Sequence, residues 1–242
     1  MMRILLAAIW FPVCVPKHFY KAMKKIGCAV STAGPTFGRY VPWMGGTIMP
    51  EGTAVRPDFV YPFNETPTYQ EIVDRLGGFD MVLSFDEGSV PGDVPPSVLN
   101  VAYDCDNHVR DWPDAGRFDR FFGAHSWANN SGKENFYWLP CSYDPEESYD
   151  LGLERRVDVG MVGCIYEHRM EAIKTLLVKN VTVLGGWGFV GEEWNRLYNL
   201  CRCALVLSHS HDLSDRLLAN MAQGCVVLAD RGIKDAEKLG LK

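Results

Sequence analysis

Residues 215–228, DRLLANMAQGCVVL, combine a polar helix start, an apolar helical face, a glycine stop and a buried strand. The same alternation of short apolar runs and helical patterns extends upstream to Val157. Because such runs alternate with helices, they predict a parallel sheet covered on both faces. We expect strands at 157–162, 181–184, 204–208 and 225–229, and helices at about 167–177, 192–201 and 214–223.

The first half of the chain shows a similar alternation. We expect strands at 3–9, 28–32, 59–61, 80–85, 98–103, 118–122 and 136–139, and helices at 16–26 and 68–76. Residues 33–57 are rich in glycine, proline and aromatic side chains, which predicts a long loop facing a substrate or, alternatively, a disordered insert. Residues 140–154 lack periodicity and predict a linker, so we divide the chain into domains 1–145 and 146–242.

Composition narrows the class of protein. The chain has 242 residues, 47% of them hydrophobic, and a net charge of −6, which argues against a general nucleic-acid binder. Eight cysteines without a Cys-x-x-Cys pair are typical of reduced thiols, so we expect a cytoplasmic protein. The apolar N-terminus predicts a first strand rather than a secretory signal, and no run reaches the length of a membrane span.

Four motifs in order resemble one known family: FDRFF at 118–122, WLPCSYDP at 138–145, VDVGMVG at 157–163 with Arg169 downstream, and the helix 216–224. Together they resemble the spore-maturation-protein (CgeB-like) family of glycosyltransferases. The resemblance implies an α/β fold of the GT-B type, with two Rossmann-like domains facing across a cleft. It also implies a metal-independent hexosyl- or pentosyltransferase, with a nucleotide sugar such as a UDP-sugar as donor and no cofactor.

The chain departs from that family in two respects. The family's helix reads Arg-x-x-Glu and its glutamate reaches the donor ribose, whereas Ala219 stands at that position here. Relatives also continue for several helices beyond the position of Lys242. The chain is therefore expected to be either a compact member with a shortened C-terminal domain or a fragment.

Donor binding requires groups that neutralise a diphosphate and hold a base. Helix N-termini and arginines bind phosphates, glycines permit close approach of the backbone, and a tryptophan can line the base. Solvated helix faces and a plain turn are the alternative interpretations. The candidate donor-binding residues are Gly163, Arg169, Gly186, Trp187, His209, Ser214, Asp215 and Arg216.

A catalytic base would lie at the carboxyl ends of the first-half strands, where open α/β sheets bind ligands. The candidates are Asp104, Asp106 and His108, with Asp86 and Glu87 after the preceding strand. These acids could instead cap turns, and a retaining transferase needs no such base. We expect no metal site, because His209 and His211 lack a well-placed third ligand.

Three other functions remain to be compared. The acceptor is open between a glycan, a protein and a modified DNA base, so a phage-type DNA-base glycosyltransferase is one alternative. A catalytically inert Rossmann-type module that binds a nucleotide or another ligand is the second. A dinucleotide oxidoreductase is disfavoured, because Trp10-Phe11-Pro12 follows the first strand where a Gly-x-Gly-x-x-Gly motif would be expected.

Overall fold

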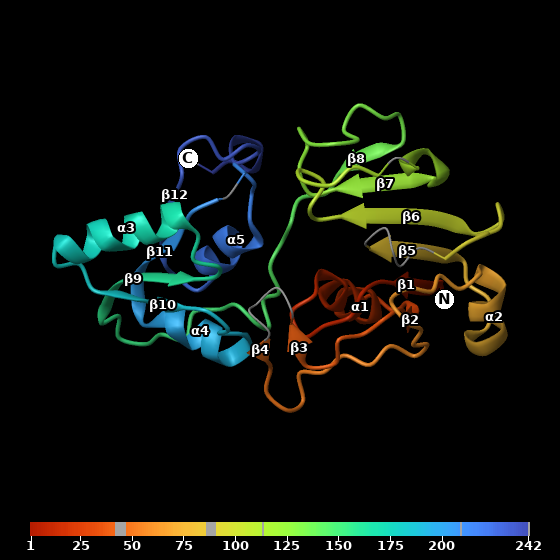
Figure 1. The fold of residues 1–242 in the computed structure, drawn as a ribbon, viewed down its shortest axis with the longest axis horizontal. Coiled ribbons are helices and arrows are strands. Elements are labelled where there is room, and N and C mark those ends of the chain that lie inside the picture. The colour runs from red at the N-terminus through yellow and green to blue at the C-terminus, as the bar shows by residue number, and fades with distance from the viewer. Residues whose placement is uncertain (42–46, 86–90, 113, 209, 242) are drawn as a thin grey trace. The chain divides into compact units, whose positions relative to one another are not determined.

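The computed structural model describes residues 1–41, 47–85, 91–112, 114–208 and 210–241. It divides into two compact units, Met1–Leu139 and Pro140–Lys242 (Figure 1). The structure divides the chain after Leu139, whereas the sequence predicted a division after residue 145. The predicted linker belongs to unit 2, because Tyr149 N–H donates to Asn195 Oδ1 at 3.2 Å and Leu151 N–H donates to Asn199 Oδ1 at 2.6 Å.

Unit 1 contains a six-stranded parallel sheet. Its spatial order is β2 (Ala29–Ala33), β1 (Arg3–Ala7), β5 (Met81–Phe85), β6 (Leu99–Asp104), β7 (Arg120–Gly123) and β8 (Phe136–Trp138). The order reverses between β1 and β5, because the chain passes from β1 out to β2 and then returns to the other side of β1. Such a reversal is the usual place for a ligand in an open α/β sheet.

In the part of unit 1 that the structure describes, two helices and a short 3₁₀ helix (Ala115–Arg117) accompany this sheet. Helix α1 (Val15–Lys25) begins with Pro16 in its first turn, where the missing N–H costs nothing. Helix α2 (Tyr69–Leu76) begins with a capping box, in which Thr68 and Glu71 exchange hydrogen bonds. The predicted boundaries of both helices agree with the structure to within one or two residues.

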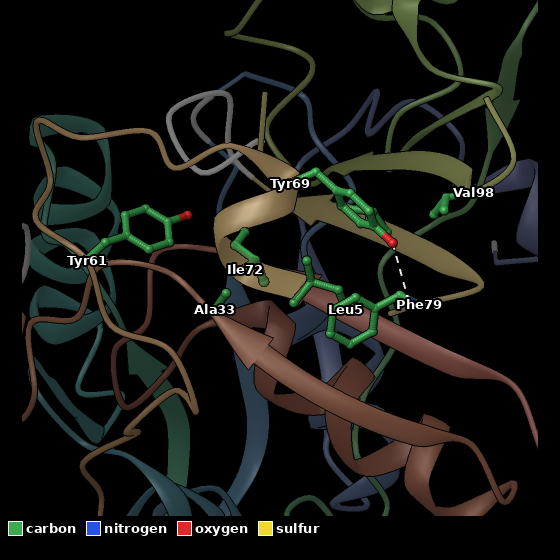
Figure 2. Close-up of a cluster of buried hydrophobic side chains, with 8 residues drawn as sticks. Leu5, Ala33, Tyr61, Tyr69, Ile72, Phe79 and Val98 are labelled. Carbon is green, nitrogen blue, oxygen red and sulfur yellow. Dashed lines mark hydrogen bonds between the residues drawn. The ribbon is translucent and has the colours of Figure 1, made fainter. Parts of the chain in front are cut away.

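Helix α2 closes a hydrophobic core against β1 and β5. Figure 2 shows this cluster, in which Tyr69 and Ile72 from α2 lie close to Leu5 from β1. The hydroxyl of Tyr69 accepts a hydrogen bond from Phe79 N–H at 3.3 Å, drawn as the dashed line. Burial of large side chains contributes roughly 1.5–3 kcal/mol each, so this cluster fixes α2 on the sheet.

The predicted long loop contains regular structure. Strands β3 (Tyr40–Val41) and β4 (Thr47–Ile48) pair in an antiparallel manner. Val41 and Met49 are fully buried, so this part of the segment packs as core. Trp43 falls within 42–46 and lies outside the described residues.

Unit 2 contains a four-stranded parallel sheet in the order β10 (Val183–Gly186), β9 (Val157–Val162), β11 (Cys201–Val206) and β12 (Val226–Ala229). Its helices are α3 (Glu167–Val178), α4 (Gly191–Asn199) and α5 (Asp215–Ala222), followed by a 3₁₀ helix (Glu237–Leu239). Strand order reverses between β9 and β11, so the carboxyl ends of these two strands define the switch point of unit 2.

Candidate functional site

The switch point of unit 2 is formed by two strand ends and one helix start. Val162 ends β9 and Gly163 follows it, Val206 ends β11, and α5 begins at Asp215 beyond the loop that follows β11. Arg216 from α5 reaches across to β9, where its Nη1 donates to the carbonyl of Val162 at 3.2 Å. The sequence-predicted residues Gly163 and Arg216 are therefore brought together.

Gly163 is required by the position of Arg216. A Cβ added at Gly163 would lie 2.5 Å from Arg216 Nη1, and the backbone φ of +137° is one that side-chain-bearing residues rarely adopt. The guanidinium occupies the space that a side chain would fill. Its Nε donates to Ser214 Oγ at 3.1 Å, while Nη2 makes no hydrogen bond within the described part of the chain. Arg216 thus retains donors for an anion.

The start of α5 is capped by the chain itself. Ser214 is the N-cap residue, and the N–H of Arg216 lies 2.7 Å from Asp215 Oδ1 and 3.3 Å from Ser214 Oγ. Both predicted donor residues therefore have a structural role at the helix start. Because Asp215 adds a negative charge there, the guanidinium of Arg216 is the stronger phosphate-binding group at this end of the helix.

Arg169 is buried, and its hydrogen bonds go to the backbone. Its Nε donates to the Leu207 carbonyl at 2.9 Å and its Nη1 donates to the Cys164 carbonyl at 2.7 Å. Its Nη2 also donates to the Leu207 carbonyl. Arg169 therefore ties the loop after β9 to the end of β11. Burial lowers the pKa of Arg169, and the positive charge of Arg216 lowers it further. Two like charges side by side are stabilised by an anion between or beside them.

The loop after β11 is held by a hydroxyl and two carboxylates. Ser208 N–H donates to Asp230 Oδ2 at 2.5 Å, and Ser208 Oγ donates to Asp212 Oδ1 at 2.5 Å. Asp212 N–H returns a hydrogen bond to Ser208 Oγ at 2.8 Å. The loop is consequently folded back beside the switch point. The predicted residue His209 lies outside the described residues.

Gly186 and Trp187 follow β10, the strand beside β9. Gly186 has a φ of +157°, and a Cβ there would lie 3.2 Å from the ring of Phe189. Trp187 is 41% exposed, so its indole presents a large apolar surface to solvent at this edge of the sheet. An exposed tryptophan at the carboxyl edge can stack on a planar ligand.

In unit 1, Asp104 ends β6 and Asp106 follows it, and both residues make local contacts. Asp104 is buried, and its Oδ1 accepts a hydrogen bond from Asp106 N–H at 2.8 Å, which fixes the turn after the strand. Asp106 lies 3.2 Å from Arg110 in an exposed ion pair. Both residues are one strand away from the reversal between β1 and β5. Asp86 and Glu87, which follow β5, lie outside the described residues.

His108 belongs to an aromatic group at the same carboxyl edge. Its ring packs edge-on against His125 with centroids 4.5 Å apart, and Trp127 lies 6.4 Å from His108. Asn107 holds the two loops together, because its amide donates to the His125 carbonyl at 2.9 Å and accepts from His125 N–H at 3.1 Å. Of the three predicted catalytic residues, His108 is half-buried and makes no ion pair within the described part of the chain.

Several contributors to these sites were not predicted from the sequence. They share a position within a few residues after a strand, which is the signal that could have found them. Ser208 and Asp230 follow β11 and β12, while Asn107 and His125 follow β6 and β7. The side chains of Asp230 and Asn107 bond to the backbone of a distant loop, and pairing of that kind depends on the spatial order of the strands.

Two hollows in unit 1 lie elsewhere. One of about 590 Å³ is lined by Phe59–Pro62, by the loop before α2 and by the outer face of α2. The other, of about 570 Å³, lies beside Arg120 and Tyr137. Neither includes a predicted site residue. No helix in the described part of the chain is long and apolar enough to cross a membrane.

Comparison with solved structures identifies the fold class. AviGT4, a glycosyltransferase involved in avilamycin A biosynthesis, superposes with a TM-score of 0.62 at 13% identity, over 99% of this chain and 81% of its own. Sucrose-phosphate synthase from Thermosynechococcus elongatus gives a TM-score of 0.54 at 12% identity, over 98% and 83%. The prediction of an α/β fold with two Rossmann-like units of the GT-B type is confirmed. No protein-family profile and no curated protein matches the sequence, so the CgeB-like resemblance stays a prediction.

Proposed function

We propose that the protein is a glycosyltransferase that transfers a sugar from a nucleotide-sugar donor, with the donor diphosphate bound at the switch point of unit 2. Structures with this fold include the glycosyltransferase AviGT4 and a sucrose-phosphate synthase. The observation that carries the proposal is the guanidinium of Arg216, which is placed over Gly163 beside a second, buried guanidinium and keeps donors for a ligand. Arginine forks suit the oxygens of a diphosphate.

The remaining donor contacts follow from the same edge of the sheet. We propose that the base or ribose of the donor packs on the exposed face of Trp187. At Gly163 and Gly186, which have no side chain, the protein backbone would come closest to the donor. Ala219 cannot contact the ribose through a carboxylate, because it has none and is buried. The ribose hydroxyls would have to be bound by other groups, and His209 stays a candidate for the sugar or phosphate.

Acceptor activation is assigned to unit 1. Of the three predicted residues, His108 is the best general base, since Asp104 fixes a turn and Asp106 pairs with Arg110. Because the diphosphate charge is met by guanidinium groups, we propose that no metal ion is required for donor binding. The eight cysteines are all free thiols, which supports a reducing compartment such as the cytoplasm.

The test is a panel of UDP-, GDP-, TDP- and ADP-sugars, with thermal shift and donor hydrolysis measured for the whole chain. We expect the sugars of one nucleotide class to raise the melting temperature. The shift should be unchanged in about 5 mM EDTA, which chelates trace divalent ions. A folded protein that responds to no donor would contradict the proposal. Nucleotide binding without hydrolysis or transfer to glycan, protein or DNA acceptors would instead support an inert binding module.

A further inference from the structure

The backbone of Val162 deviates from the pattern of the sheet in unit 2. Val159 N–H bonds to Thr182 and Gly163 N–H bonds to Gly186, so alternate peptide groups of β9 face β10. The N–H and carbonyl of Val162 therefore face the opposite side, toward β11. The register between β9 and β11, however, pairs residues only up to Gly160 and Ala204, although both strands continue beyond that point.

Two side chains bond to Val162 where β11 would otherwise pair. Tyr198 Oη accepts a hydrogen bond from Val162 N–H at 2.9 Å, and Arg216 Nη1 donates to the Val162 carbonyl at 3.2 Å. Both backbone groups of Val162 are thereby satisfied without a partner strand, as buried backbone groups require. The two strands can consequently diverge before they end, and the crevice opens at the switch point.

Tyr198 is held firmly in this position. It lies on α4 with 1% of its surface exposed, and Trp194 packs edge-on against its ring at 5.3 Å. Gly160 leaves room for the ring, because a Cβ there would lie 3.1 Å from two of its carbons. Burial raises the pKa of Tyr198, so the hydroxyl remains protonated and neutral at physiological pH. A neutral hydroxyl can accept the Val162 N–H without adding a negative charge beside Arg216.

We propose that Tyr198 is a positioning residue for the diphosphate site, a role that rests on the proposed function. Its hydroxyl accepts the Val162 N–H and so holds the backbone at Val162. The Val162 carbonyl in turn positions Arg216, and Arg216 binds the diphosphate. Tyr198 touches neither donor nor acceptor in this scheme. Removal of one oxygen on α4 is therefore expected to weaken diphosphate binding through the backbone of β9.

The variant Tyr198→Phe removes only the hydroxyl. Affinity for the best-bound nucleoside diphosphate and for inorganic pyrophosphate is measured by calorimetry, well below the melting temperature of each variant. We expect both affinities to fall about tenfold, since the Val162 N–H loses its partner and the peptide that holds Arg216 is released. Tyr69→Phe is the matched control, because Tyr69 Oη also accepts a backbone N–H, from Phe79 in unit 1. It is expected to lose similar stability and to keep wild-type affinity.

A double-mutant cycle separates positioning from general weakening. In an Arg216→Lys background, Tyr198→Phe is expected to change diphosphate affinity by less than about twofold, because the route through the Val162 carbonyl is already broken. An equal tenfold loss in both backgrounds would overturn the role of Tyr198. Hydrogen exchange on the wild-type chain gives a second measure: diphosphate should slow exchange of the Val162 amide, and an unchanged rate would also overturn it.

The outcomes distinguish this inference from the function on which it rests. Wild-type binding with unchanged affinity in Tyr198→Phe leaves the diphosphate site intact and rejects Tyr198 alone. If the folded wild-type chain binds no nucleoside diphosphate and no pyrophosphate, both proposals fail together.

Discussion

The two sheets reverse their strand order in the same way but treat the strand ends differently. In unit 1, β1 continues beyond its last residue, with Ala8 N–H bonded to Ala33 at 3.1 Å and Trp10 N–H bonded to Pro35 at 2.9 Å. The indole of Trp10 is buried and donates to the Ala33 carbonyl at 2.8 Å. In unit 2, pairing between β9 and β11 stops before the strands end, and side chains bond to the backbone of Val162 instead.

The two regions also differ in the groups they present. Beyond the end of β1 in unit 1, backbone pairing and the buried indole of Trp10 occupy the side toward β2, whereas the switch point of unit 2 is lined with two guanidinium groups. Imidazole and carboxylate groups gather in unit 1 after β6 and β7. We therefore expect changes in unit 2 to act on donor affinity and changes in unit 1 to act on turnover.

The largest effect is expected from His108→Ala in unit 1. If His108 accepts the acceptor proton, its loss should lower kcat about 100-fold or more, the usual contribution of a general base, with donor affinity unchanged. Initial rates and calorimetry on the same preparation check both quantities. Asp106→Asn serves as comparison and should change kcat by less than about threefold, because its exposed ion pair with Arg110 contributes little. If His108→Ala kept the wild-type kcat, His108 would not be the general base.

The next effect belongs to Arg216→Ala in unit 2. We expect donor affinity to fall roughly 30- to 100-fold, since two or more charge-assisted hydrogen bonds to the diphosphate are lost. The expected loss appears in the dissociation constant measured by calorimetry. Arg202→Ala is the control, because Arg202 is exposed on the same sheet and pairs with Asp158 at 2.7 Å. Equal affinities for Arg216→Ala and Arg202→Ala would contradict a donor site at the switch point.

A smaller loss is expected from Gly163→Ala. The new Cβ would press on Arg216 Nη1 and the backbone φ of +137° would be strained, so the guanidinium must move. We expect donor affinity to fall about tenfold, with a lower melting temperature. Gly232→Ala adds similar backbone strain at φ +83° with nothing within 4 Å, and should lower stability without changing affinity. A match between the two variants in donor affinity would indicate that strain alone is responsible.

Much of the fold could be predicted from the sequence, because local signals were strong. The capping box at Thr68 and the glycine after the last helical run placed α2 and α5 to within about a residue. Errors occurred where leucine and cysteine residues follow a helix directly. The predicted helix 192–201 and strand 204–208 became α4 ending at Asn199 and β11 beginning at Cys201.

The candidate site could be predicted only in its residue types. Arg216 and Gly163 were found because glycine and arginine after strands are typical of phosphate sites, and the structure places them in contact. The role of Arg169 was not visible, since its hydrogen bonds reach the Leu207 carbonyl, which follows a different strand. Tyr198 lay outside every motif, because its hydroxyl matters only once β9 and β11 are known to diverge.

The smallest expected effect is on the stability of the protein at alkaline pH, with one buried group compared in each unit. Burial raises the pKa of Cys201 in unit 2 from 9.0 to about 12, and that of Tyr61 in unit 1 from 10.0 to about 12. Because each pKa is higher in the folded state, the protonated group contributes stability that is complete below the unfolded pKa and is lost as pH rises. Loss should therefore begin near pH 9 for Cys201 and near pH 10 for Tyr61.

Urea unfolding between pH 8 and about 10.5 separates these contributions, because this range includes both unfolded pKa values. Cys201→Ala should flatten the fall in stability from pH 9 upward, and Tyr61→Phe should flatten it only above pH 10. The comparison uses slopes, since both substitutions also change stability at neutral pH by altering buried packing. If both variants lost stability with pH at the same slope as the wild-type chain, neither group would stay protonated in the folded protein. The sheet of unit 2 would then be more open to water near Cys201 than its burial indicates.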